Sequence, residues 1–193
     1  MIAPPNPQGK GLVPLLDCLA QARAVTVPPK GLEQISHELF TSLFVLQSRF
    51  AFKPVPGKIY YLYQRANGFA LSLIGPQEWG GGGFGLCVGQ CMLQNDVTWT
   101  LELDPQAREN ETLMRYIETT RKQFEQALFE AQTLEAALPV HVKTLSFYQR
   151  LLAWALAGSL RSSMHQSGLR NLSYAEARKA LVDSRQVKPN PHE

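Results

Sequence analysis

The sequence has little cysteine, little excess charge and no long apolar run. Its 193 residues include three cysteines, an odd number, which does not suit a disulfide framework. No segment approaches the roughly 18 apolar residues of a membrane span. Residues 1–11 are polar and rich in proline and lack the apolar core of a signal peptide. We therefore expect a soluble, cytoplasmic protein with reduced thiols and no membrane span.

Recognisable catalytic and cofactor motifs are also missing. There is no G-x-S-x-G elbow and no cluster of His, Cys and carboxylates at metal-ligand spacing. Cys87 and Cys91 lie four apart in an extended segment, about 13 Å between their Cα atoms, too far for a shared disulfide. The run Gly80–Gly83 before Phe84 formally fits G-x-G-x-x-G, but no helix follows to hold a pyrophosphate. The sequence predicts no cofactor and no metal, and it favours a non-catalytic protein.

Charge is unevenly spread, although its total is small. The chain carries 19 basic and 16 acidic residues, a net charge of +3. Residues 141–193 alone hold eight basic and three acidic residues, a net charge of +5. A basic C-terminal region can contact RNA, anionic lipid or an acidic partner, but its charges are interspersed, which is typical of a solvated helical face. We favour a protein partner or self-association over a nucleic acid.

Length and composition indicate one domain. At 193 residues and 45% hydrophobic content the chain can bury a single core. We expect this domain over 1–183, with helices and a sheet in 12–103, a helical region in 104–183 and a flexible tail over 184–193.

Apolar spacing predicts an α+β fold. Helical spacing is found over 14–27, where Leu15, Leu16 and Leu19 recur before Pro28, and again over 31–50. The period then changes to two, which predicts a small antiparallel meander of about four strands over 59–63, 69–74, 86–93 and 97–103. Asp104-Pro105 begins a predicted helix to Leu138, which would form a C-terminal helical hairpin with a helix over 142–164. Ser173 and Glu176 form a capping-box pattern that starts a last helix to about residue 182.

Polar and aromatic residues near the strand ends suggest a binding site. In a meander the ends of the first, second and third strands could bring Arg65, Glu78 and Asp96 together. An arginine between two carboxylates would brace the loops, and the same residues could instead rim a ligand pocket. The candidate binding residues are Arg65, Glu78, Trp79, Asp96 and Trp99. No residue is assigned a catalytic role.

Three segments of the sheet region resemble a known family. They are Gly57–Arg65 (G-x-IYYLY-x-R), Pro76–Gly80 (P-x-EWG) and Leu93–Thr100 (LQ-x-D-x-x-WT). In this order they resemble the domain of unknown function 2452 family over about 57–100. The resemblance implies a shared fold unit and carries no activity.

The functional hypothesis is a non-catalytic protein-binding or assembly module. Two alternatives stay open: a small-ligand enzyme that uses an Arg65/Glu78 cluster, and an RNA-associated factor that uses the basic C-terminal helices.

Overall fold

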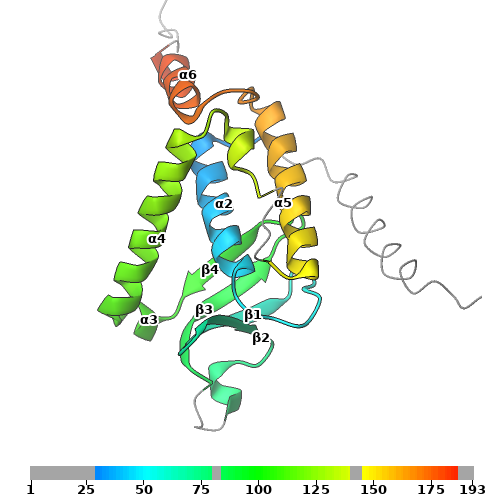
Figure 1. Ribbon diagram of the computed structural model, residues 1–193, viewed down its shortest axis with the longest axis vertical. Helices are drawn as coiled ribbons and strands as arrows, with labels where there is room; N and C mark the ends of the chain where they lie inside the picture. The colour runs from blue at the N-terminus through cyan, green and yellow to red at the C-terminus, as the bar shows by residue number, and fades with distance from the viewer. Residues whose placement is uncertain (1–28, 80–83, 140–144, 187–193) are drawn as a thin grey trace, which may run out of the picture.

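The computed structural model describes residues 29–79, 84–139 and 145–186. The predicted helix over 14–27 and the glycine run Gly80–Gly83 lie outside these residues. Four strands form one sheet, and helices cover one of its faces (Figure 1). The strands are β1 (Ile59–Arg65), β2 (Gly68–Ser72), β3 (Leu86–Leu93) and β4 (Trp99–Leu103). The α+β class is therefore confirmed.

The order of the strands corrects the predicted meander. All neighbouring strands are antiparallel, but the order is β2-β1-β3-β4, so that β3 pairs with β1 and not with β2. The turns between β1 and β2 and between β3 and β4 each join neighbouring antiparallel strands, as expected. The segment between β2 and β3, which contains the 3₁₀ helix η1 (Pro76–Trp79), is long enough to carry the chain past β1. A tight turn would have forced β3 onto β2.

Helix α2 (Leu32–Leu46) is the central element of the core. Figure 1 shows it between α4 (Glu111–Glu130) and α5 (Phe147–Gln166), and it packs against β4 as well. Its buried residues point in several directions, among them Ile35, Leu39 and Phe44. From the sheet, Tyr60, Leu62 and Trp99 join the same apolar cluster. A helix buried on most of its surface fits a position between two helices and a sheet.

Helix α2 ends four residues before the predicted Phe50 because the chain turns toward the sheet. The Arg49 N–H donates to the Phe69 carbonyl at 2.8 Å, and the Leu71 N–H donates to the Arg49 carbonyl at 3.0 Å. Arg49 thus forms a parallel bridge along β2. The apolar spacing alone did not show that the backbone of Arg49 bonds to β2 instead of continuing the helix.

The predicted C-terminal helical hairpin is wrong in two respects. The helix expected over 104–138 is broken at Asn110 into α3 (Pro105–Glu109) and α4, and it ends at Glu130 before a 3₁₀ turn, η2 (Leu134–Ala137). Asn110 stops α3 because its side chain caps α4, accepting from the Leu113 N–H at 2.9 Å. In addition, α4 and α5 both pack on α2, which lies between them. Helix α4 does have an apolar side, but this side packs on α2 and not on α5.

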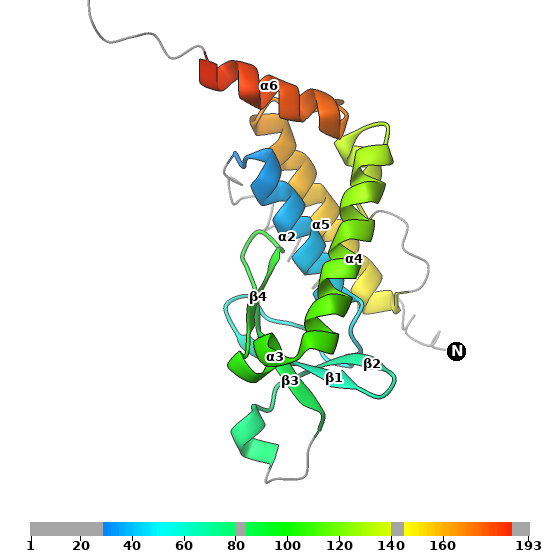
Figure 2. The same ribbon diagram turned by 90° about the vertical axis from the view of Figure 1, so that its left-hand side faces the viewer.

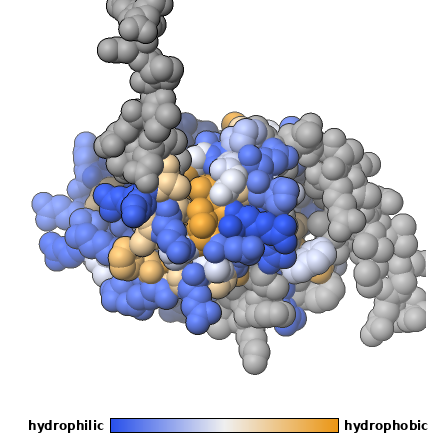
Figure 3. All heavy atoms as spheres, turned by 90° about the horizontal axis from the view of Figure 1, so that it is seen from above, coloured by the Kyte–Doolittle hydropathy of each residue, from blue (hydrophilic) through white to orange (hydrophobic). Residues whose placement is uncertain are grey.

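The last helix, α6 (Tyr174–Gln186), begins as predicted. The Ser173 N–H donates to Glu176 Oε2 at 2.8 Å and the Glu176 N–H donates to Ser173 Oγ at 3.3 Å, so the capping box is confirmed. The helix continues three residues into the expected tail. Figure 2 shows α6 across the end of the helix layer, and Figure 3 shows this end with mostly hydrophilic residues around a small apolar area.

Lys30 joins three parts of the fold. Its side chain is only 4% exposed, and its Nζ donates to the carboxylates of Glu38 on α2 and Asp96 in the β3–β4 turn. Its backbone N–H donates to Ser167 Oγ at 2.9 Å, and this hydroxyl donates to the Lys30 carbonyl at 2.8 Å. We call Lys30, Glu38 and Asp96 the Lys30 cluster. It ties the start of α2 to the sheet and to the end of α5.

Replacing Trp99 should destabilise the fold strongly. Trp99 is 1% exposed and packs against Tyr60, with ring centroids 5.8 Å apart. We expect Trp99→Ala to lower the free energy of unfolding by about 3–5 kcal/mol, the usual cost of removing a buried tryptophan. Urea unfolding followed by circular dichroism would measure this. Trp79 is only partly buried, so Trp79→Ala should cost less; an equal loss would contradict this difference.

The Lys30 cluster predicts a loss of stability in acid. Although burial opposes it, hydrogen bonds from Lys30 and Thr98 lower the pKa of Asp96 below its ordinary value of 3.8. The charged form therefore stabilises the fold above this value, and its contribution disappears as the pH falls through the lowered pKa. At neutral pH we expect Asp96→Asn to cost about 1–3 kcal/mol of unfolding free energy. The difference between the two proteins should shrink on acidification, and a constant difference would show that the charge of Asp96 contributes nothing.

Candidate binding site

An aromatic cluster covers the face of β1 that points away from the helices. Tyr63, Trp79 and Phe84 form it, and Tyr63 is only 1% exposed although it lies outside the main core. The rings of Trp79 and Phe84 stack with centroids 4.5 Å apart and planes 9° apart. Tyr63 meets both edge-on, at 5.1 Å from Phe84 and 6.5 Å from Trp79. This second, smaller cluster fixes the loop between β2 and β3 on the sheet.

Local hydrogen bonds shape the loop that carries Trp79. The Glu78 Oε1 atom accepts from the Gly75 N–H at 2.8 Å, which closes the turn into η1. The Tyr63 hydroxyl donates to the Ile74 carbonyl at 3.0 Å, just before this turn. Glu78 is exposed, yet one of its carboxylate oxygens already has this structural role.

Gly85 allows the loop to return to the sheet. It adopts a φ of +135°, and a Cβ atom there would lie 2.2 Å from the Gln64 carbonyl oxygen. Only glycine fits such a close approach of two backbones. Phe84 is therefore held directly beside the end of β1.

Arg65, the last residue of β1, lies against this cluster. Its guanidinium carbon is 4.3 Å from the centroid of the Phe84 ring, a cation–π geometry. Beside it is an open hollow of about 580 Å³, lined by Gln64, Arg65, Ala66, Phe84 and Gly85. Arg65 itself is exposed. Its side chain is thus oriented by an aromatic ring while its hydrogen-bond donors remain near solvent.

The structure separates the five candidate residues into two groups. Arg65, Glu78 and Trp79 lie near one end of the sheet, whereas Asp96 and Trp99 lie at the other. The pairing explains this separation, because Gln64 at the end of β1 faces Leu86 at the start of β3, and the β3–β4 turn is therefore at the opposite end.

The expected brace of Arg65 with Glu78 and Asp96 is not formed among the described residues. The Arg65 guanidinium lies over the Phe84 ring, and Glu78 accepts a hydrogen bond from the Gly75 backbone. Asp96 forms a salt bridge with Lys30. Trp99 belongs to the main core, and its backbone N–H donates to Ser42 Oγ at 2.9 Å. The interpretation assumed that all turns of a meander gather polar groups, but the ends of antiparallel strands alternate between two edges.

The thiols are poorly suited to nucleophilic chemistry. Burial raises the pKa of Cys91, which lies in the core, and it also raises the pKa of the partly buried Cys87. Both shifts favour the neutral thiol, whereas the thiolate is the nucleophile. No group of three His, Cys, Asp or Glu residues in the described ranges is arranged to hold a metal ion.

Sequence reasoning missed Phe84 and Lys30. Phe84 follows the glycine run directly, and a large aromatic residue between glycines was a usable signal for a ring held by backbone turns. Lys30 follows Pro28-Pro29 and precedes a helix, and nothing in that pattern indicates a buried ammonium group.

Comparison with known proteins agrees with the resemblance seen in the sequence. No solved structure matches the chain. None of the described helices combines the length and the apolar character needed to cross a membrane. The family model described as "Protein of unknown function (DUF2452)" matches residues 41–121, beyond the expected 57–100 on both sides. This segment, which holds the whole sheet and the candidate site, is similar to the DUF2452 family.

Proposed function

We propose that this chain is a non-catalytic protein-binding module whose contact site is the hollow beside Arg65. The observation that carries the proposal is the position of the Arg65 guanidinium, 4.3 Å above Phe84 and beside an open hollow of about 580 Å³. A side chain held in this way loses less conformational freedom on binding than a free arginine. Arginine is also enriched among the residues that dominate protein interfaces.

The chemistry of the hollow favours a carboxylate on the partner. A guanidinium donates two parallel hydrogen bonds to a carboxylate, and neither Glu78 nor Asp96 supplies that acceptor. Phe84 offers an apolar surface next to the cation, which suits an aspartate, a glutamate or a chain terminus with neighbouring apolar atoms. The partner segment we propose is a short acidic peptide on another protein.

The enzyme alternative would use Arg65 and Glu78 as reacting groups. Proton transfer needs a group placed at the reacting atom. Glu78 instead accepts a backbone N–H within its own turn. This contact favours a structural role for Glu78.

The RNA alternative would use the basic C-terminal helices. Arg161, Arg170, Arg178 and Lys179 are all exposed and would supply phosphate contacts. Such binding would weaken steeply with salt and would be insensitive to Arg65.

Removing the Arg65 side chain should weaken peptide binding without destabilising the fold. An array of peptides with Asp, Glu or free C-terminal carboxylates is probed with the purified chain, and each peptide is paired with its amide version. We expect Arg65→Ala to weaken carboxylate-dependent binding about 10- to 100-fold, because a charge-assisted hydrogen bond contributes about 1.5–3 kcal/mol.

The matched control is Arg115→Ala, an exposed arginine on α4. Arg115→Ala should bind the peptides as tightly as the unaltered chain does. Both variants should have the melting temperature of the unaltered chain. If Arg65→Ala bound the peptides as tightly as the unaltered chain does, the proposal would be wrong. Salt-sensitive RNA binding that is lost on neutralising Arg161, Arg170, Arg178 and Lys179 would favour the RNA alternative.

Changes at Glu78 distinguish a binding module from an enzyme. Glutamine keeps an Oε1 acceptor for the Gly75 N–H, so we expect Glu78→Gln to preserve both the melting temperature and peptide binding. Glu78→Ala removes the acceptor and should cost about 1 kcal/mol of unfolding free energy. If a substrate screen found turnover that Glu78→Gln removed while stability and binding were preserved, the enzyme alternative would replace the module.

A further inference from the structure

Strand β4 lies at a border of the sheet, next to β3. Hydrogen bonds at both ends of β4 fix which of its backbone groups face β3. The Gln94 N–H donates to the Thr98 carbonyl at 2.8 Å, and the Asp104 N–H donates to the Val88 carbonyl at 2.9 Å. Because the bonds of an antiparallel pair recur at every second residue, the even-numbered residues of β4 bond to β3. The backbone groups of the odd-numbered residues therefore point outward from the sheet.

Three residues of β4 present backbone groups at this border: Trp99, Leu101 and Leu103. Two of these groups already have partners, since the Trp99 N–H donates to Ser42 Oγ at 2.9 Å and the Leu103 carbonyl accepts from Arg108 Nε at 3.2 Å. The other four groups have no hydrogen-bond partner in the described part of the chain. They are the Trp99 carbonyl, the N–H and carbonyl of Leu101, and the Leu103 N–H. The edge of β4 thus offers two donors and two acceptors.

These four groups are complementary to the same four groups of a second copy. When two β4 strands run antiparallel about a two-fold axis at Leu101, the two Leu101 residues exchange two hydrogen bonds. The Leu103 N–H of each copy then reaches the Trp99 carbonyl of the other. The two groups that already have partners, the Trp99 N–H and the Leu103 carbonyl, face each other across the axis. The pairing therefore leaves no group of either edge unmatched.

The side chains of β4 are compatible with this pairing. Thr100 and Glu102 are both exposed, and the two-fold axis places Thr100 of one copy opposite Glu102 of the other. Like charges therefore do not lie directly opposite each other. Leu101 and Leu103, which pack against the core and are partly exposed, lie on the other face of the strand. Leu101 would meet the Leu101 of the second copy there, so the pairing also buries apolar surface.

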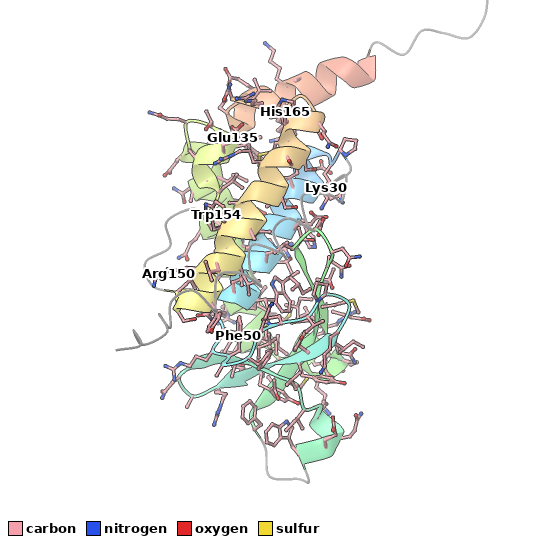
Figure 4. The ribbon with its side chains drawn as sticks, turned by 90° about the vertical axis from the view of Figure 1, so that its right-hand side faces the viewer. Lys30, Phe50, Glu135, Arg150, Trp154 and His165 are labelled. Atoms are coloured by element: carbon pink, nitrogen blue, oxygen red, sulfur yellow. The ribbon has the colours of Figure 1, made fainter. Side chains whose placement is uncertain are left out.

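Contacts at both ends of β4 hold this edge in place. Asp96, in the turn before β4, forms a salt bridge with Lys30, and Figure 4 shows Lys30 directly above this turn. The bonds from Ser42 and Arg108 fix the first and last residues of the strand. An edge that is already ordered loses less conformational freedom on pairing than a mobile one.

From these observations we propose that β4 is a self-association site, at which two copies of this chain join their sheets into one continuous antiparallel sheet. Four backbone hydrogen bonds predict a reversible dimer. The contact is independent of the hollow beside Arg65, because that hollow lies at the end of β1 and β3 separates β1 from β4.

A proline at position 101 tests the contact in the full chain. Because the Leu101 N–H points outward, Leu101→Pro removes two of the four intermolecular hydrogen bonds and none within the sheet. Leu101→Ala, which shortens the same side chain but keeps the N–H, is the matched control. In sedimentation velocity over a range of concentrations, Leu101→Pro should raise the dissociation constant of the dimer about 10- to 100-fold above that of Leu101→Ala.

Circular dichroism should show both variants to be folded, and Leu101→Pro should keep the peptide binding of the hollow beside Arg65. An unaltered chain that sediments as a monomer at every concentration would overturn the proposal. A dimer that Leu101→Pro leaves as stable as Leu101→Ala does would also overturn it, and would assign the association to another surface.

Introduced cysteines test the register, and they do so even if Leu101→Pro fails to fold. Thr100→Cys and Glu102→Cys are prepared as separate proteins and mixed under mild oxidation. The proposed pairing places the Cβ atoms of these two positions in different copies about 5 Å apart, close enough for a disulfide after a small adjustment. The mixture should therefore form an intermolecular disulfide between positions 100 and 102 at least about tenfold faster than either variant alone, whose cysteines lie on diagonal positions.

Gln90→Cys, at an exposed position on β3, takes the place of Thr100→Cys in the matched control mixture. Position 90 lies one strand further from the second copy, so this mixture should form the intermolecular disulfide no faster than the single variants. Peptide mapping by mass spectrometry identifies the joined residues. Equal rates for the two mixtures would overturn the proposed pairing.

Discussion

The burial of α2 is the constraint on which the rest of the structure depends. A sheet of four short strands has too little apolar surface to stabilise a domain, and neither α4 nor α5 could cover it without a helix between them. Because α2 packs on β4 and on both flanking helices, one element completes the apolar surfaces of three others. The Lys30 cluster fixes the start of this helix, and Arg49 directs the chain away from its end.

The two faces of the sheet have different roles for the same reason. Alternation along β1 sends Tyr60 and Leu62 toward α2, and it sends Tyr63 to the side that no helix covers. That side is closed by a loop whose own residues, Trp79 and Phe84, stack on each other. A surface formed by a loop on a rigid sheet is a common setting for recognition, and Arg65 is located where β1 meets this loop.

Local patterns predicted much of the fold, whereas the long-range choices escaped them. The period of two predicted the four strands to within two residues at each end, and the capping box at Ser173 was predicted correctly because its signal lies within four residues. The strand order, the break at Asn110 and the partner of α4 depend on contacts between distant segments, which spacing does not encode. The candidate site failed in the same way: Asp96 was grouped with Arg65 by chemistry, while its actual partner, Lys30, lies 66 residues earlier.

Arg49 and Ser42 both come from α2 or the residues just after it, and they reach opposite borders of the sheet. Arg49 forms hydrogen bonds with backbone groups of Phe69 and Leu71 on the outer side of β2, while Ser42 Oγ accepts the backbone N–H of Trp99 on β4. Unpaired groups on border strands are templates for adding a strand from another chain, which is a route to aggregation and to domain swapping. Helix α2 and the residues just after it thus occupy backbone groups on both border strands of the sheet. A strand from another chain could therefore not pair with the sheet at these backbone groups.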